Sequence, residues 1–158
     1  MTIVTALVTP EGAWLGADSL ASDDELRVTS SSPKVARFRN FLLGFSGGYG
    51  AGQQIFAEAK AKPDLTLAQF VKSVKVKGGD WSLLAVDYSG VYEVNADKGM
   101  VKMQKIRGYS YGATGSGTGV ALGALYADHT DQGSLIRAMK AAAAHTNHVR
   151  GPYKVISL

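Results

Sequence analysis

Thr2 holds the position in this sequence that most directly suggests chemistry, because removal of Met1 would make it the first residue. A threonine hydroxyl alone is a poor nucleophile, but the free α-amine of an N-terminal threonine can accept the hydroxyl proton. With a pKa of about 8, against about 10.4 for a lysine side chain, that amine is partly neutral at neutral pH. Threonine is small, so we expect the removal of Met1. Thr2 would then be both nucleophile and base, whereas an amide nitrogen behind Met1 could not act as a base.

Ser46 is a second candidate nucleophile, because it stands in the G-x-S-x-G sequence of residues 44–48. Between a strand and a helix, this motif forms the nucleophile elbow of α/β-hydrolases. Asp128, with His145 or His148, would supply the acid and the base in the required chain order. Those enzymes alternate strands and helices over a longer chain than this one. A serine hydrolase that uses Ser46 is therefore kept as an alternative behind Thr2.

A glycine-rich turn at residues 115–119 invites a nucleotide-binding interpretation. The third glycine of G-x-G-x-x-G would fall on Val120, and no acidic residue follows at the spacing of about 20 residues that a dinucleotide site requires. No Lys-Ser or Lys-Thr pair follows either, as a phosphate-binding loop would need. The three histidines of the chain are too loosely placed for a metal site. We therefore expect helix-opening glycines, with no cofactor and no metal.

The composition excludes several further classes of protein. The 158 residues carry a net charge of +4, and the lysines of residues 60–77 are interleaved with acidic and glycine residues, which favours a solvated face over a nucleic-acid site. The absence of cysteine excludes disulfides and suits a reducing cytoplasm. No apolar run approaches the roughly 20 residues of a membrane-spanning helix, and no basic region opens a signal peptide. We expect one cytoplasmic domain, residues 1–158, that binds neither membrane nor nucleic acid.

Strands and helices must bring the candidate residues together, and the hydrophobic pattern predicts where they lie. Polar residues 19–24 are typical of a loop, and four or five strands precede the first helix. Strands are expected at residues 3–8, 13–18, 26–29, 34–38, 41–46, 81–87, 91–95, 101–106, 109–113 and 153–158. Helices are expected at residues 51–62, from Asp64 or Thr66 to 74, at 115–128, and from a Ser134 cap to 146. This order is an α+β arrangement of segregated layers rather than a series of βαβ units.

Four elements of the sequence share the spacing of a known family. They are Thr2, from which the spacing is counted, the aspartate of Gly-Ala-Asp-Ser (Asp18), the lysine of Pro-Lys-Val (Lys34) and the glycine pair of Gly-Phe-Ser-Gly-Gly (Gly47 and Gly48). On these residues the chain resembles the proteasome β-type subunits, and HslV in particular, of the N-terminal nucleophile (Ntn) hydrolase superfamily. The resemblance covers nearly the whole chain, with a shorter segment between residues 61 and 80.

The resemblance implies a fold, an activity and an assembly. The fold would be a four-layer αββα sandwich in which two antiparallel sheets pack face to face between helices. The activity would be that of a threonine endopeptidase or amidohydrolase, in which Thr2 attacks a carbonyl group and forms an ester acyl-enzyme that water releases. The family assembles into rings of six or seven subunits, usually stacked, and HslV works with an AAA+ unfoldase on unfolded protein. Peptides or unfolded proteins are therefore the expected substrates of a homo-oligomeric ring.

The resemblance also implies roles for the matching residues. The charge of Lys34 would disfavour protonation of the α-amine and favour a developing alkoxide on Thr2, and Asp18 would hold Lys34 in place. Gly48, at the start of a helix, can point its N–H group at the oxyanion of a tetrahedral intermediate. Ser116, in a turn that resembles the serine-bearing turn of the family, would join the hydrogen bonds around the amine.

Two small residues, Ser46 and Ala21, are expected to line the first specificity pocket, which should be roomy. One segment departs from the family pattern: Asn147 replaces an aspartate, and Arg150 follows where the family has a serine before two glycines. Asn147 cannot supply a carboxylate to support the amine. A catalytically silent ring subunit with the same fold is therefore a further alternative, favoured if Met1 persists or if Asn147 disables the site.

Overall fold

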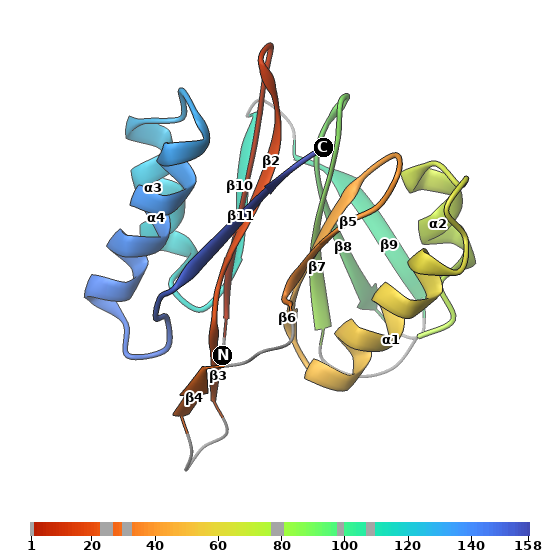
Figure 1. Ribbon diagram of the computed structural model, residues 1–158, viewed down its shortest axis with the longest axis horizontal. Helices are drawn as coiled ribbons and strands as arrows, with labels where there is room; N and C mark the ends of the chain where they lie inside the picture. Colours follow the sequence, from red (N-terminus) through yellow and green to blue (C-terminus); the bar gives the residue numbers. More distant parts are fainter. Residues whose placement is uncertain (1, 23–26, 30–32, 77–80, 98–99, 107–109) are drawn as a thin grey trace.

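The chain folds into four layers (Figure 1), and the computed structural model describes residues 2–22, 27–29, 33–76, 81–97, 100–106 and 110–158. Two antiparallel sheets lie face to face. Helices α3 (Thr118–Ala127) and α4 (Gln132–His145) cover the outer face of one sheet. Helices α1 (Tyr49–Lys60) and α2 (Leu67–Ser73) cover the outer face of the other. The expected αββα sandwich is confirmed.

The first sheet has the strand order β10-β1-β2-β11 and the second has the order β5-β6-β7-β8-β9. The first comprises β1 (Ile3–Thr9), β2 (Gly12–Asp18), β10 (Tyr111–Gly115) and β11 (Tyr153–Ser157). The second comprises β5 (Val35–Arg37), β6 (Leu42–Gly47), β7 (Trp81–Asp87), β8 (Gly90–Asp97) and β9 (Met100–Lys105). A separate hairpin pairs β3 (Leu20–Ser22) with β4 (Arg27–Thr29). Every strand pairing among the described residues is antiparallel.

β1 is buried on both faces because it lies between two strands of its sheet and between two layers. Its side chains alternate in direction, as the two-residue period of a strand requires. Ile3 and Leu7 join the core under α3 and α4, whereas Val4 and Ala6 join the core between the two sheets. The hairpin of β1 and β2 thus forms the middle of the sandwich, and it fixes the position of Thr2 at the start of β1.

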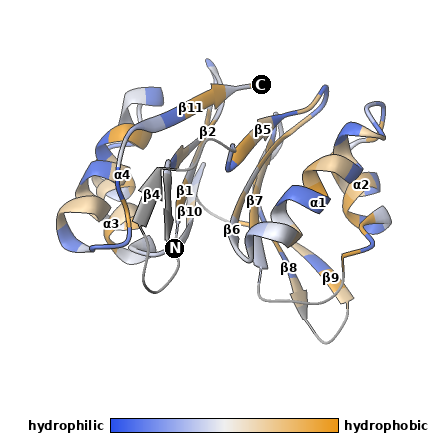
Figure 2. Ribbon diagram, turned by 60° about the horizontal axis from the view of Figure 1, so that its bottom comes forward, coloured by the Kyte–Doolittle hydropathy of each residue, from blue (hydrophilic) through white to orange (hydrophobic). Residues whose placement is uncertain are grey.

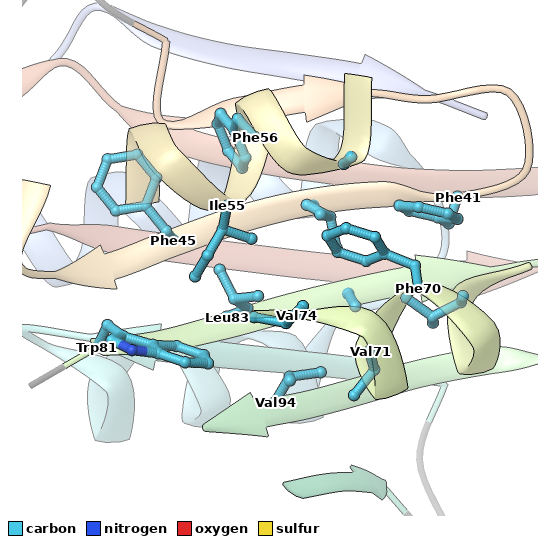
Figure 3. Packing of buried hydrophobic residues seen from close by; sticks show 14 residues of the cluster. Phe41, Phe45, Ile55, Phe56, Phe70, Val71, Val74, Trp81, Leu83 and Val94 are labelled. Atoms are coloured by element: carbon cyan, nitrogen blue, oxygen red, sulfur yellow. The ribbon is translucent and has the colours of Figure 1, made fainter. Parts of the chain in front are cut away.

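An aromatic core fills the space between the second sheet and its two helices (Figure 3). The rings of Phe41 and Phe70 stack with centroids 5.4 Å apart, and Phe45 meets Phe56 edge to face at 5.4 Å. α1 approaches this sheet closely at Gly52, where a Cβ would lie 2.4 Å from the Phe45 ring. Hydrophilic residues gather on the outward side of α1 and α2 (Figure 2). The packing of these helices fixes the place where β6 ends and α1 begins.

The structure corrects three details of the sequence-based expectations. Residues 20–22 are strand β3 rather than loop, because they pair with β4, so six strands among the described residues, and not four or five, precede α1. α4 is capped by Asp131, whose carboxylate accepts from the Ser134 N–H at 3.0 Å, so Ser134 is the partner in a capping box and not the cap itself. Of the two caps expected for α2, Asp64 and Thr66, the structure has Thr66, with Gln69 completing a capping box.

The described helices have neither the length nor the continuous apolar character of a membrane-spanning segment. Within the same residues, no group of three acidic or imidazole side chains stands close enough together to hold a metal ion.

Candidate active site

Thr2 lies at one end of the sandwich, where four segments that are distant in sequence meet. It is buried, with 7% of its surface exposed, and it borders a pocket of about 590 Å³. The start of β1 and the junction of β6 with α1 lie at this same end (Figure 1). The lining residues are Thr2, Ser46, Gly47, Gly48, Ser82, Gly115 and Ser116. The fold therefore brings together four predicted site residues, namely Thr2, Ser46, Gly48 and Ser116.

A buried ion pair stands directly behind Thr2. Lys34 Nζ lies 3.0 Å from Asp18 Oδ1, and the two side chains are 4% and 0% exposed. The same Asp18 oxygen accepts a hydrogen bond from the Ile3 N–H, also at 3.0 Å. Lys34 Nζ and the Ile3 nitrogen contact the same Asp18 oxygen. The ammonium group therefore lies at most twice 3.0 Å from the peptide bond that joins Thr2 to Ile3. Asp18 and Lys34 are thus brought together beside the candidate nucleophile.

Local structure explains why the pair meets at this point. Asp18 is the last residue of β2, and β2 runs beside β1 with Ala17 opposite Val4, so the carboxylate falls next to the beginning of β1. Lys34 precedes β5, and its carbonyl accepts a hydrogen bond from the Phe45 N–H of β6 at 3.0 Å. One member of the pair therefore comes from each sheet, and the packing of the sheets fixes their separation.

Burial governs the electrostatics of this pair. Desolvation lowers the pKa of Lys34 below its ordinary value, while the charge of Asp18 and its hydrogen bond oppose that fall. Without the carboxylate, the ammonium form would therefore be much less favourable. The arrangement places a positive charge, supported by one carboxylate, close to the amino end of the mature chain that removal of Met1 would create.

The segment with the unexpected Asn147 contacts Asp18 through its backbone. The Arg150 N–H lies 3.5 Å from Asp18 Oδ2, and burial together with the Asp18 charge raises the pKa of Tyr153. Asn147 is exposed and borders a separate recess of about 310 Å³ that Arg150 and Tyr153 also line. The structure thus places Arg150 behind the site, whereas Asn147 does not line the Thr2 pocket.

The glycine-rich turn after β10 is fitted around the carbonyl group of Thr2. The Ser116 N–H donates a 2.7 Å hydrogen bond to Thr2 O. Gly115 has a φ of 102°, and a Cβ at that position would lie 2.0 Å from the same oxygen. A side chain at position 115 is therefore excluded by both conformation and space. The turn that resembles a nucleotide-binding motif instead holds residue 2 in place.

The glycine pair of residues 47 and 48 opens the pocket toward the start of α1. Gly47 adopts a φ of 97°, which favours glycine, and both glycines are exposed at the pocket. Gly48 is the N-cap of α1, and no side chain caps the helix there. The first N–H groups of an α-helix lack partners within the helix, so the beginning of α1 presents hydrogen-bond donors and a partial positive charge. This end of α1 is suited to an anionic oxygen.

The triad of the Ser46 alternative does not form, because its members lie apart. Asp128 follows the last turn of α3 and accepts a 2.8 Å hydrogen bond from Arg137 Nε. His145 is the last residue of α4. The last turns of α4 pack beside the beginning of α3, because a Cβ on Gly117 would lie 3.0 Å from Ala142. The ten residues of α3 separate these two ends by about 15 Å. Asp128 therefore cannot orient His145, or His148 just beyond it, as a general base.

Two polar residues of the site, Ser82 and Thr114, escape sequence reasoning. Thr114 Oγ1 lies 3.3 Å from Ser46 Oγ and donates to Ser82 Oγ at 3.2 Å. Each belongs to an otherwise mostly apolar strand. A single hydroxyl group in such a strand was the only sign in the sequence that these residues belong to the site. Ala21 pairs with Val28 in the β3–β4 hairpin, but its side chain lies outside the described residues, and so does Met1.

Comparisons with known proteins agree on the fold. No protein-family model and no curated protein matches the sequence. Among solved structures, HslV from Trypanosoma brucei superposes with a TM-score of 0.76 at 17% identity, over 100% of this chain and 99% of that one. BPH from Thiobacillus denitrificans, solved in complex with epoxomicin, superposes with a TM-score of 0.76 at 19% identity, over 99% and 97%. A second structure of BPH gives 0.74 at 17% identity and the same coverage.

These likenesses extend over whole chains, so they concern the complete arrangement of sheets and helices and not a shared motif alone. At identities below 20%, they establish architecture. The chain therefore has the HslV-like fold of the N-terminal nucleophile hydrolases.

Proposed function

We propose that residues 1–158 form one N-terminal nucleophile hydrolase domain, a threonine peptidase or amidohydrolase of the proteasome and HslV type. The observation that supports this most is the buried Asp18 carboxylate, which contacts both the Lys34 ammonium and the Ile3 amide behind Thr2. Burying an ion pair carries a large desolvation cost. A charged pair retained at this point is readily explained if the adjoining residue needs a fixed positive charge for its chemistry.

The proposed reaction begins after Met1 is removed. The α-amine of Thr2 takes the proton of the Thr2 hydroxyl while Oγ1 bonds to the carbonyl carbon of the substrate. Lys34 favours this step, because its charge lowers the proton affinity of a nearby amine and stabilises negative charge on the attacking oxygen. The ammonium group of Thr2 then returns the proton to the leaving amine as the C–N bond breaks. The product of this half-reaction is an ester between the acyl group and Thr2.

The second half-reaction releases the acyl group. The amine of Thr2 accepts a proton from water, the resulting hydroxide adds to the ester carbon, and Thr2 Oγ1 leaves and recovers its proton. In both halves a tetrahedral oxyanion forms, and we assign its stabilisation to the Gly48 N–H at the start of α1. The hydrogen bond from Ser116 to Thr2 O holds the residue in position for both steps. Ser46 and Ala21 are proposed to line the pocket for the substrate side chain.

The proposal extends to a homo-oligomeric ring of six or seven subunits that degrades peptides or unfolded proteins, with an AAA+ unfoldase as partner. The surface of α3 supports an assembled state. Its ten residues include no charged side chain, and Tyr126 is 70% exposed. A mostly apolar recess of about 680 Å³ adjoins it, lined in part by Leu122, Tyr126 and Tyr111. Light scattering of the purified protein would test this, since a single ring has six or seven times the mass of one chain and a stacked pair of rings has twice that mass.

The chemistry is tested first by the intact mass of the protein. Loss of the mass of Met1 is expected, and full retention in native material would exclude an active Thr2. Thr2→Ala and Ser46→Ala are then compared on fluorogenic peptides. Thr2→Ala should abolish turnover and Ser46→Ala should leave a measurable rate, and the reverse pattern would refute the assignment of Thr2. Epoxomicin, present in one of the similar structures, should bind the wild type and bind Thr2→Ala much more weakly.

A catalytically silent subunit of the same fold is the second candidate, favoured by Asn147, which replaces a carboxylate and does not line the pocket of Thr2. The two candidates differ in one outcome. Protein that has lost Met1 and forms the expected assembly, yet neither turns over peptides nor binds epoxomicin, is a silent subunit. Recovery of turnover in Asn147→Asp would then identify the missing carboxylate as the cause.

A further inference from the structure

Three hydroxyl groups from three strands form a continuous chain beside the Thr2 pocket. Ser46 of β6 contacts Thr114 of β10 with 3.3 Å between their oxygens, and Thr114 donates to Ser82 of β7 at 3.2 Å. Ser46 and Ser82 both line the pocket, while Thr114 lies between them and is 9% exposed. This chain of hydroxyl groups therefore begins and ends at the pocket surface where a substrate would lie.

Counting protons gives this chain a direction. A hydroxyl group carries one proton and can accept two hydrogen bonds. Thr114 gives its proton to Ser82, so Ser46 must be the donor in the contact between Ser46 and Thr114. Ser82 then retains its own proton, and among the described residues no acceptor takes it. A donor is thus left at the pocket wall, and each hydroxyl before it polarises the next.

The surroundings of Ser82 indicate what this donor would meet. The Thr2 pocket is lined by threonine, serines and glycines, without a charged side chain among its described residues. On the other side, Ser82 borders an adjoining polar recess of about 540 Å³ whose other polar lining residues are Glu93, Asn95, Lys102 and Gln104. A substrate side chain that extends past Ser82 would therefore first accept a hydrogen bond from the Ser82 hydroxyl. Beyond it, N–H groups of the same side chain would meet acceptor oxygens of the polar recess.

We infer that Ser82 is a specificity-determining residue, and that the pocket selects a carboxamide side chain, glutamine before asparagine, at the substrate residue whose carbonyl is attacked. This rests on the proposed function, because that function makes the Thr2 pocket the place of this side chain. The carboxamide oxygen accepts from Ser82, and its NH₂ group points to the polar recess beyond. Methionine, which has a similar size and no hydrogen-bonding amide, is the matched ligand that the pocket disfavours.

The inference is tested by binding, so that its outcome does not depend on turnover. Dye-labelled tetrapeptide amides that differ only in a final Gln or Met are titrated into Thr2→Ala protein, and fluorescence anisotropy gives both affinities. The Gln peptide should bind about fivefold more tightly, as expected for one neutral hydrogen bond. Adding Ser82→Ala should remove this preference, and adding Ser82→Thr, which keeps the hydroxyl, should retain it.

Two further variants separate the hydroxyl chain from simple packing. Thr114→Val breaks the chain at constant shape and should reduce the preference for Gln, whereas Thr5→Val alters another buried threonine of the same sheet and should leave it unchanged. Equal binding of both peptides to the Thr2→Ala protein, or a preference that survives Ser82→Ala, overturns the inference even if Thr2 proves catalytic. Absence of binding by either peptide also overturns it. Failure of the proposed function is recognised separately, by wild-type protein without turnover and without epoxomicin binding.

Discussion

Replacing Asp18 by asparagine should reveal what the buried ion pair contributes, because it removes one charge at almost constant shape. In the wild type the carboxylate contacts Lys34 Nζ and the Ile3 N–H at 3.0 Å each, and neither charged side chain is more than 4% exposed. Removing one partner of a buried pair typically costs about 3–5 kcal/mol, because the other charge remains without compensation. We expect Asp18→Asn to lower the free energy of unfolding by an amount in this range at pH 6.

The cost should depend on pH, and its sign follows from Lys34. Burial already lowers the pKa of Lys34, and Asp18 opposes that fall. In Asp18→Asn the folded-state pKa falls further, while the unfolded-state pKa stays near its ordinary 10.5. Between these two values the unfolded chain binds more protons, so stability rises with pH. The destabilisation caused by Asp18→Asn should therefore be largest at pH 6 and smaller at pH 9, where Lys34 can lose its proton.

Urea unfolding followed by circular dichroism at both pH values measures this effect. Asp64→Asn is the matched control, because Asp64 pairs with Arg39 at 2.6 Å while both side chains are more than 70% exposed. Exposed pairs contribute little, so this variant should change stability by about 0.5 kcal/mol or less. If Asp18→Asn is no more destabilising than the control at pH 6, or equally destabilising at pH 9, the electrostatic account of the pair is wrong.

Three further substitutions test the packing around the site and the core. Gly115→Ala should lower the free energy of unfolding by about 1–3 kcal/mol and reduce turnover, because its Cβ would meet Thr2 O. Gly119 has open space around it, so the control Gly119→Ala should keep turnover and have a melting temperature no lower than the wild type. Thr5→Val should raise the free energy of unfolding in urea by about 1 kcal/mol, because Thr5 Oγ1 is buried without a partner among the described residues; a loss of stability would show that the hydroxyl is satisfied. Phe70→Ala should cost about 3–5 kcal/mol in thermal unfolding, whereas truncating the exposed Tyr126 should cost far less, and equal losses would contradict the described core.

Local signals in the sequence predicted most of the elements. The β-rich runs of residues 3–8 and 13–18 predicted strands β1 and β2, and the N-cap of α2 proves to be Thr66, one of its two expected caps. Strand β3 was missed because a three-residue strand in a polar stretch offers no period to detect. Its pairing with β4 is a tertiary contact, and such contacts override local preference.

The candidate site was predictable only as far as spacing allowed. Thr2, Asp18 and Lys34 could be grouped because the resemblance supplied their relation, whereas the contacts themselves come from the packing of two sheets. The link from Thr114 to Ser82 crosses 32 positions of the chain and joins residues of both sheets. No local pattern encodes such a contact. The need for glycine at position 115 also has a cause that is distant in sequence, because a side chain there would collide with the carbonyl oxygen of Thr2.

The pairing of β1 with β10 also determines when the site can close during synthesis. Thr2 is synthesised long before the residues that enclose it, because Ile3 pairs with Gly115 and Thr2 itself is held by Ser116. At translation rates of about 5–20 residues per second, those partners emerge on the order of ten seconds later. Thr2 therefore stays accessible throughout that interval, and it becomes enclosed only when the second half of the chain arrives. Trimming of the amino end is best suited to the growing chain, before the fold covers it.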